Sequence, residues 1–236
     1  MKNFTMRRGI AMGAVTLLLT GIALSSQMDQ KFPQFQQQNA RALKQYKWKS
    51  RMEIQKGGEV RSVKLNLLSY DVDGTLRKTL ISSTPEPELP TRGIRGRIAQ
   101  KKKESFLETL DSLGALAKSY SELPSREMQR FMSTAIVTPE IGPNRKLLRI
   151  KGGDVLQPGD SMTLWVDAVT RRLRKIEIQA ALERKPVSVV SDFQDLPQGP
   201  TYTARSVVDY RSMELILITE NFDYERVTRD SEGSLR

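Results

Sequence analysis

The feature that most constrains this chain is a two-residue alternation of apolar and polar side chains that begins at Tyr46. Across residues 46–55, Tyr, Trp, Ser, Met and Ile alternate with Lys, Lys, Arg, Glu and Gln. Successive side chains of a β-strand point to opposite faces, so this pattern predicts a strand with one buried and one wet face. Gly57-Gly58 and Asp73-Gly74 are hairpin-turn signals, and the segments that follow them are also strand-like. The sequence therefore predicts three consecutive antiparallel strands before residue 84.

The C-terminal third of the chain carries the same kind of signal. Turn-forming residues such as those at 157–160 and 196–200 separate short segments rich in apolar residues. We expect strands at about residues 146–151, 162–166, 175–180, 187–193, 202–210 and 213–224. Strands that follow one another without intervening helices form an antiparallel sheet.

Helical periodicity is found in three places. Residues 29–46 are Gln-rich with apolar residues at helical spacing, residues 97–120 follow a Pro-rich break, and a further helix follows Pro124. A sheet of seven to ten strands must curl or be covered, and these helices are too few to flank both faces. The predicted fold class is α+β: a strongly curved antiparallel sheet, an unclosed β-barrel, with helices covering its concave face.

The N-terminal 26 residues are typical of an export signal. Three basic residues precede an uncharged apolar stretch, residues 10–24, and Ala23-Leu24-Ser25 offers small residues for cleavage. The stretch is shorter than the roughly 20 residues that cross a bilayer as a helix. We expect a signal peptide at 1–26, a domain at 27–228 with a helical insertion at about 92–134, and a polar tail at 229–236. The expected location is the periplasm of a Gram-negative bacterium, with an uncleaved membrane anchor as the alternative.

Composition excludes several kinds of chemistry. The chain has no His and no Cys, so it has no His-dependent catalytic triad, thiol nucleophile, disulfide or thiolate metal site, and no cofactor is predicted. Its formal net charge of +11 suits an anionic surface such as a lipid headgroup layer. Nucleic acid is not an expected partner, because no nucleic-acid-binding motif is present. One basic cluster is either a contact with an anionic membrane surface, which is then a candidate partner, or a solvated helix face. Its residues are Arg92, Arg95, Arg97, Lys101, Lys102 and Lys103.

One motif suggests an enzyme. Residues 71–76, DVDGTL, resemble the signature of haloacid dehalogenase-type phosphohydrolases, which implies Asp71 as nucleophile and Asp73 as acid/base beside Mg²⁺. That family places the motif after a buried parallel strand and before a helix. Here the preceding segment alternates and the following one is strand-like, so a hairpin turn is the favoured interpretation. The Mg²⁺-dependent phosphohydrolase remains an alternative.

Three longer segments resemble the periplasmic lipoprotein-carrier superfamily, which includes the lipoprotein localisation carrier and outer-membrane lipoprotein-sorting proteins. They are YKWKSRMEIQKGGEV, YDVDGTLRKTLI and GDSMTLWVDAVTRRLRKIEI, and the resemblance spans about residues 28–226. The most specific part is the strand at 164–167 followed by the segment 172–176. The resemblance implies an unclosed β-barrel with a helical lid that holds acyl chains in an apolar cavity.

The expected function is that of an exported, non-enzymatic protein that carries lipid or acylated protein. A dry groove can hold an acyl chain without polar contacts, since each buried methylene contributes about 0.8 kcal/mol. A structural envelope protein with a filled core is the alternative, and the same positions would then be packed core. The predicted cavity-facing residues are Trp48, Met52, Leu65, Leu67, Leu164, Val166, Ile176 and Ile178.

Overall fold

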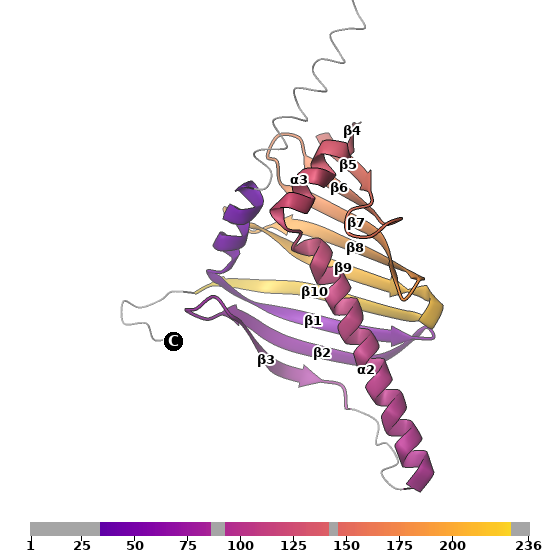
Figure 1. Cartoon of the computed structure of the whole chain (residues 1–236). Coiled ribbons are helices and arrows are strands. Elements are labelled where there is room, and N and C mark those ends of the chain that lie inside the picture. Colours follow the sequence, from indigo (N-terminus) through magenta and orange to yellow (C-terminus); the bar gives the residue numbers. More distant parts are fainter. Residues whose placement is uncertain (1–33, 86–92, 142–145, 228–236) are drawn as a thin grey trace, which may run out of the picture.

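The computed structural model describes residues 34–85, 93–141 and 146–227 (Figure 1). The predicted signal peptide, the C-terminal tail and Arg92 lie outside these ranges. Within them the strands form one open antiparallel sheet with edges at β3 and β4, in the order β3-β2-β1-β10-β9-β8-β7-β6-β5-β4. The ten strands are β1 (Tyr46–Lys56), β2 (Glu59–Tyr70), β3 (Leu76–Ser83), β4 (Ile136–Ile141), β5 (Lys146–Gly153), β6 (Ser161–Asp167), β7 (Leu173–Leu182), β8 (Lys185–Asp195), β9 (Thr201–Tyr210) and β10 (Leu215–Arg226).

Local turn chemistry explains the hairpins. Gly57 and Gly58 both have positive φ, at 62° and 78°, and join β1 to β2. The β7–β8 hairpin is made the same way by Glu183 and Arg184, with φ of 50° and 65°. A two-residue turn of this type needs positive φ at both positions, which glycine and asparagine usually supply. The Glu-Arg pair therefore gives no turn signal in the sequence, although it forms the turn.

The helices lie on one face of the sheet. They are α1, described over residues 34–43, α2 (Gly93–Ser121) and α3 (Ser125–Thr134), and a short 3₁₀ helix, η1 (Arg211–Met213), precedes β10. Figure 1 shows α2 running obliquely across the sheet, with its N-terminal end projecting beyond the strands. The α+β fold with helices on one face of a curved open sheet is confirmed.

The hydrophobic core lies between these helices and the strands beneath them. Leu113 and Tyr120 of α2 and Phe131 of α3 are almost fully buried against apolar side chains of the sheet. Among these sheet residues are Ile150, Met162, Leu164, Val166, Ile178, Val187 and Leu215. The C-terminal half of α2 and the whole of α3 are thus fixed to the sheet by apolar packing, since burial of each such side chain contributes about 1.5–3 kcal/mol.

One strand and the start of one helix were not predicted from the sequence. β4 was not predicted: it is a short edge strand with Pro139 at its centre, a position where the missing N–H disrupts the fewest ladder bonds. α2 begins at Gly93 rather than near residue 97. Gly93 and Gly96 lower the intrinsic helix propensity of this first turn, which obscures its start in the sequence.

Candidate functional site

An apolar pocket lies where α1, the end of α2 and the start of α3 meet over β6 and β7. Its volume is about 270 Å³, close to the lower limit of the roughly 300–1,000 Å³ usual for ligand sites. Its floor is apolar and its rim polar, because Leu164, Met162 and Leu173 are buried whereas Ser121 and Glu122 are exposed. The lining residues are Gln36, Gln37, Ala40, Tyr120, Ser121, Glu122, Leu123, Ser125, Met128, Met162, Leu164, Leu173 and Ile176.

The wall of this pocket is held by a buried tyrosine–aspartate contact. The Tyr120 hydroxyl donates to Asp160, whose carboxylate also accepts from the N–H groups of Leu156 and Gln157, each at 2.9 Å, and of Val155. Burial alone would raise the pKa of Asp160, but the hydrogen bonds from Tyr120 and from the backbone outweigh it and lower the pKa. Burial and the contact with Asp160 raise the pKa of Tyr120. The pair fixes the end of α2 to the β5–β6 turn.

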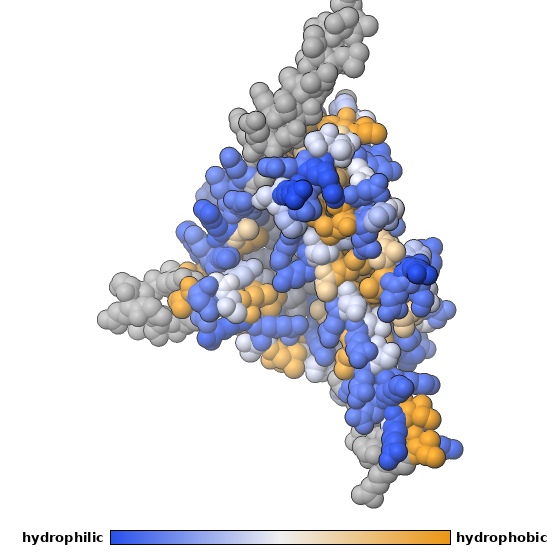
Figure 2. All heavy atoms as spheres, in the orientation of Figure 1, coloured by the Kyte–Doolittle hydropathy of each residue, from blue (hydrophilic) through white to orange (hydrophobic). Residues whose placement is uncertain are grey.

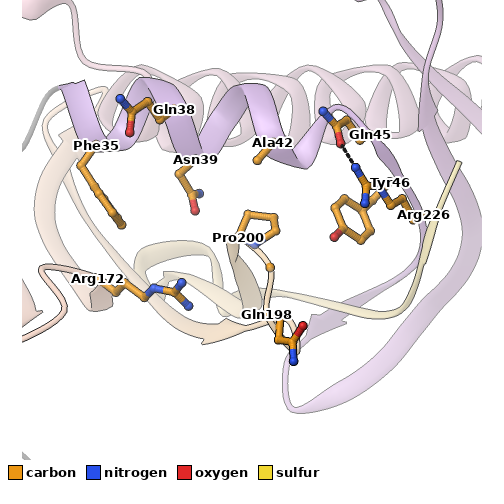
Figure 3. Close-up of a pocket in the computed structure, with 11 residues that line it drawn as sticks. Phe35, Gln38, Asn39, Ala42, Gln45, Tyr46, Arg172, Gln198, Pro200 and Arg226 are labelled. Atoms are coloured by element: carbon orange, nitrogen blue, oxygen red, sulfur yellow. Dashed lines mark hydrogen bonds between the residues drawn. The ribbon is translucent and has the colours of Figure 1, made fainter.

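A second, polar pocket of about 330 Å³ lies on the other side of α1 (Figure 3). It is an open pocket bordered by α1, the start of β1, the end of β10, the β8–β9 turn and the residue before β7. Figure 3 shows Arg172 and Arg226 at its two ends, with the Arg172 guanidinium pointing toward the middle. The lining residues are Phe35, Gln38, Asn39, Ala42, Gln45, Tyr46, Arg172, Gln198, Gly199, Pro200 and Arg226.

Asn39 connects α1 to this region of the sheet. Its Nδ2 donates to the Thr201 carbonyl and its Oδ1 accepts from the Thr201 N–H, both at 2.7 Å. The Thr201 hydroxyl donates to Asp195 at 2.7 Å, and Asp195 pairs with Arg172 at 3.1 Å and Arg174 at 2.8 Å. Burial opposes ionisation of Asp195, but these partners prevail and lower its pKa. A network of hydrogen bonds and ion pairs thus runs from α1 to the Arg172 side of the pocket.

The structure separates the eight predicted cavity residues. Leu164 and Ile176 line the apolar pocket, whereas Val166 and Ile178 are buried in the core beside it. Trp48 and Met52 are on β1. They lie on the same face of the sheet as Leu164 and Ile176 but do not line this pocket.

The prediction for Leu65 and Leu67 needs correction. The register pairs Lys49 with Leu67 and Arg51 with Leu65, so both leucines lie on the opposite face from Trp48. The cause is a bulge: Gln55 pairs with Val60, but Ile54 pairs with Ser62. The extra residue at this point inverts the faces of all later β2 side chains. The eight residues therefore cannot line one cavity.

An aromatic cluster beside α1 was missed from sequence. Trp48 stacks on Tyr224 with ring centroids 5.4 Å apart and an interplanar angle of 7°, and Tyr202 lies 4.3 Å from Tyr224. Tyr70 approaches Trp48 at 5.8 Å. Burial raises the pKa of the Tyr224 hydroxyl. Trp48, Tyr202 and Tyr224 lie in segments that were predicted as strands, but only the strand order, which places β1 between β2 and β10, brings them together with Tyr70.

Asp71 and Asp73 form a hairpin turn between antiparallel strands. The Asp73 carboxylate accepts from the Thr75 N–H at 2.8 Å, Gly74 has a φ of 84°, and Asp71 pairs with Arg77 at 2.6 Å. Hydrogen bonding to Thr75 lowers the pKa of Asp73. β3 rather than a helix follows, so the strand–turn–helix context of the phosphohydrolase motif is not present at this turn.

Two further observations concern the described residues only. In residues 34–85, 93–141 and 146–227, no cluster of three or more Asp or Glu residues is arranged to hold a metal ion. No helix in those same ranges combines the length and hydrophobicity of a membrane span.

Comparison with known proteins gives structural matches alone. No protein-family model and no curated protein matches the sequence. Among the solved structures that match are the following three, each with 10% sequence identity. A LolA superfamily protein from Nitrosomonas europaea has a TM-score of 0.36, with 83% of this chain and 95% of that chain covered. A DUF1329 family protein from Desulfovibrio piger has a TM-score of 0.40, with 90% and 94% covered.

The third match is a domain named as a putative outer membrane lipoprotein-sorting protein, from Vibrio parahaemolyticus. Its TM-score is 0.42, and the match covers 86% of this chain and 93% of that chain.

Proposed function

We propose that this protein is a non-enzymatic carrier of the cell envelope that binds an acyl chain, of a lipid or of a lipidated protein, in the apolar pocket. The observation that supports it is the pocket itself, whose floor of Met162, Leu164 and Leu173 is buried and whose rim is polar. A pocket of this size accepts part of a chain. About eight methylenes transferred from water would contribute roughly 6 kcal/mol, at about 0.8 kcal/mol each.

The pocket has one wall fixed by core packing and an opposite wall supplied by α1. α3 and the end of α2 are fixed by core packing, whereas α1 contributes Gln36, Gln37 and Ala40 to the opposite wall. A ligand therefore lies between a rigid floor and a helix tied to the sheet by the side chain of Asn39. The leader-like residues 1–26 support the placement of this activity in the envelope.

Native mass spectrometry of the purified full-length chain tests the proposal. We expect co-purifying species of lipid mass, and saturable binding of a fluorescent fatty acid. Met128→Trp fills the pocket from α3 and should abolish both, whereas Leu107→Trp, at a half-exposed site on α2 away from the pocket, should retain both. Circular dichroism melting checks that the variants fold. A wild-type chain that binds neither natural lipid nor the probe would indicate the filled-core alternative.

A second surface supports an anionic membrane as partner. Ile94 and Ile98 lie one turn apart near the start of α2, and 79% and 51% of their surfaces are exposed. In Figure 2 this end of α2 shows an apolar patch beside strongly polar side chains. The neighbouring basic residues on the helix are Arg95, Arg97, Lys101, Lys102 and Lys103.

We propose that this end of α2 lies on the anionic membrane surface. Basic side chains near such a surface contribute about 1 kcal/mol each, and exposed isoleucines can enter the headgroup boundary. The projection of α2 beyond the sheet leaves its N-terminal end accessible to a flat surface (Figure 1).

A further inference from the structure

Helix α1 separates the two pockets, and its residues divide between them by helical periodicity. Gln36, Gln37 and Ala40 line the apolar pocket, whereas the interleaved positions 35, 38, 39 and 42 line the polar one. The sheet side divides in the same way. Arg172 lines the polar pocket, and Leu173, the next residue in the chain, lines the apolar pocket. An apolar and a cationic compartment therefore lie side by side.

The polar pocket has the electrostatic character of an anion site. Two arginines line it, and none of its described lining residues carries a carboxylate. Four side-chain amides that can donate hydrogen bonds also line it: Gln38, Asn39, Gln45 and Gln198.

The nearby carboxylates lie outside the lining of the pocket. Asp195 pairs with Arg172 and Arg174, Asp167 lies 4.0 Å from Arg174, and neither aspartate is among the lining residues. The contact of Asp195 with Arg172 is made through Nη1, whereas a guanidinium carries five N–H donors. Arg226, at the other end, donates to the neutral Gln45 Oε1 at 3.0 Å (Figure 3).

We propose that the polar pocket binds a carboxylate or phosphate group through the Arg172 guanidinium, with Arg226 adding attraction from the other end. A planar guanidinium fits both groups through paired N–H donors. The group is either the headgroup of the amphiphile whose chain occupies the apolar pocket or a free anion. The headgroup source depends on the proposed function, whereas anion binding itself does not.

A set of matched probes distinguishes these sources. Octyl phosphate, 1-octanol and inorganic phosphate are titrated into the full-length chain at low ionic strength, below the micellar range, by calorimetry or NMR. We expect octyl phosphate to bind at least tenfold more tightly than 1-octanol. In Arg172→Gln this preference should fall to twofold or less, while 1-octanol affinity stays unchanged.

Two further variants control for the possibility that Arg172→Gln misfolds. Arg172→Gln also removes an ion pair with Asp195, so Arg226→Gln, which removes a hydrogen bond to the neutral Gln45, gives an independent measurement with an expected loss of two- to fivefold. Arg211→Gln removes an exposed guanidinium in η1, outside the pocket, and should retain the full preference.

Each outcome decides between the two proposals. Binding of inorganic phosphate, lost in Arg172→Gln, without any binding of 1-octanol would support the anion site and reject the acyl carrier. Equal affinity for octyl phosphate and 1-octanol would reject the anion site and leave the acyl carrier standing. A preference for octyl phosphate that persists in both arginine variants would also overturn the anion site.

Discussion

Asn39 and Thr201 exchange two hydrogen bonds of 2.7 Å, so that one side chain of α1 pairs with the first residue of β9 as a neighbouring strand would. Thr201 is nearly fully buried. Since α1 forms a wall of both pockets, this pair sets the position of the helix relative to them.

Replacing Asn39 should therefore loosen α1. Asn39→Ala leaves the Thr201 N–H and carbonyl without these partners, which costs about 1–3 kcal/mol. Hydrogen exchange over residues 34–43 should become faster, and binding of the fatty-acid probe should weaken. Arg41→Ala, an exposed change on the same helix, is the control and should alter neither. Unchanged exchange in Asn39→Ala would show that other contacts hold the helix.

Asp160→Asn should reduce stability in a pH-dependent way. The pKa of Asp160 is lowered in the folded state, so its contribution is complete above its ordinary pKa near 4 and is lost as the pH falls through the lowered value. We expect the variant to be less stable by about 2 kcal/mol at pH 7, because an amide cannot accept from the Tyr120 hydroxyl and the backbone N–H groups equally well. Urea denaturation at pH 7 and pH 3 measures the difference, which should shrink at pH 3. A constant difference across this range would contradict the assignment.

Two glycine substitutions should have opposite effects. A Cβ at Gly152 would lie 2.9 Å from the Phe131 ring, which is buried in the core, so Gly152→Ala should cost about 1–3 kcal/mol. Gly114 lies inside α2, and outside its own helix turn no atom lies within 4 Å of the position that a Cβ would occupy, so Gly114→Ala should add about 0.5–1 kcal/mol. Thermal and urea unfolding measure both. Equal effects at the two sites would show that the Phe131 ring of α3 does not pack closely against Gly152 of β5.

Membrane association should depend on the exposed end of α2. Replacing both Ile94 and Ile98 by Asn removes apolar insertion and should weaken binding to anionic vesicles about tenfold or more, at about 25 cal/mol per Å² of apolar surface. Changing the lysines at 101–103 to Gln should reduce the salt dependence of binding. Val169→Asn, an 80% exposed residue of the β6–β7 turn, is the control. Vesicle sedimentation supplies the measurement, and binding that resists salt would reject the electrostatic part.

The Asp71 turn should be structural. We expect no Mg²⁺-dependent hydrolysis of p-nitrophenyl phosphate by the wild-type chain or by Asp71→Asn. The variant should lose up to about 1 kcal/mol of stability, because its pair with the exposed Arg77 is weakened. Hydrolysis that is present in the wild type and lost in Asp71→Asn would instead support the phosphohydrolase.

The sequence was sufficient for features that depend on nearby residues. Alternation from Tyr46 onward predicted β1, and the glycines at 57 and 58 and the turn at 71–74 predicted its meander with β2 and β3. Nine of the ten strands were recognised in this way, whereas β4 carries only a short apolar signal interrupted by Pro139. Leu164 and Ile176, which were predicted to share a face, pair directly across β6 and β7, next to the register shift between Trp165 and Val166.

The two faces of β2 were decided only in the folded chain. Alternation shows that successive residues point to opposite sides, but it does not show which side meets the helices. The bulge opposite Ile54 and Gln55 reverses that choice for Leu65 and Leu67. The pockets depend even more on tertiary structure, since the polar one joins Asn39, Arg172, Gln198 and Arg226 from distant parts of the chain. Periodicity is a local property, whereas a binding site is formed by the strand order and helix packing that bring such distant segments together.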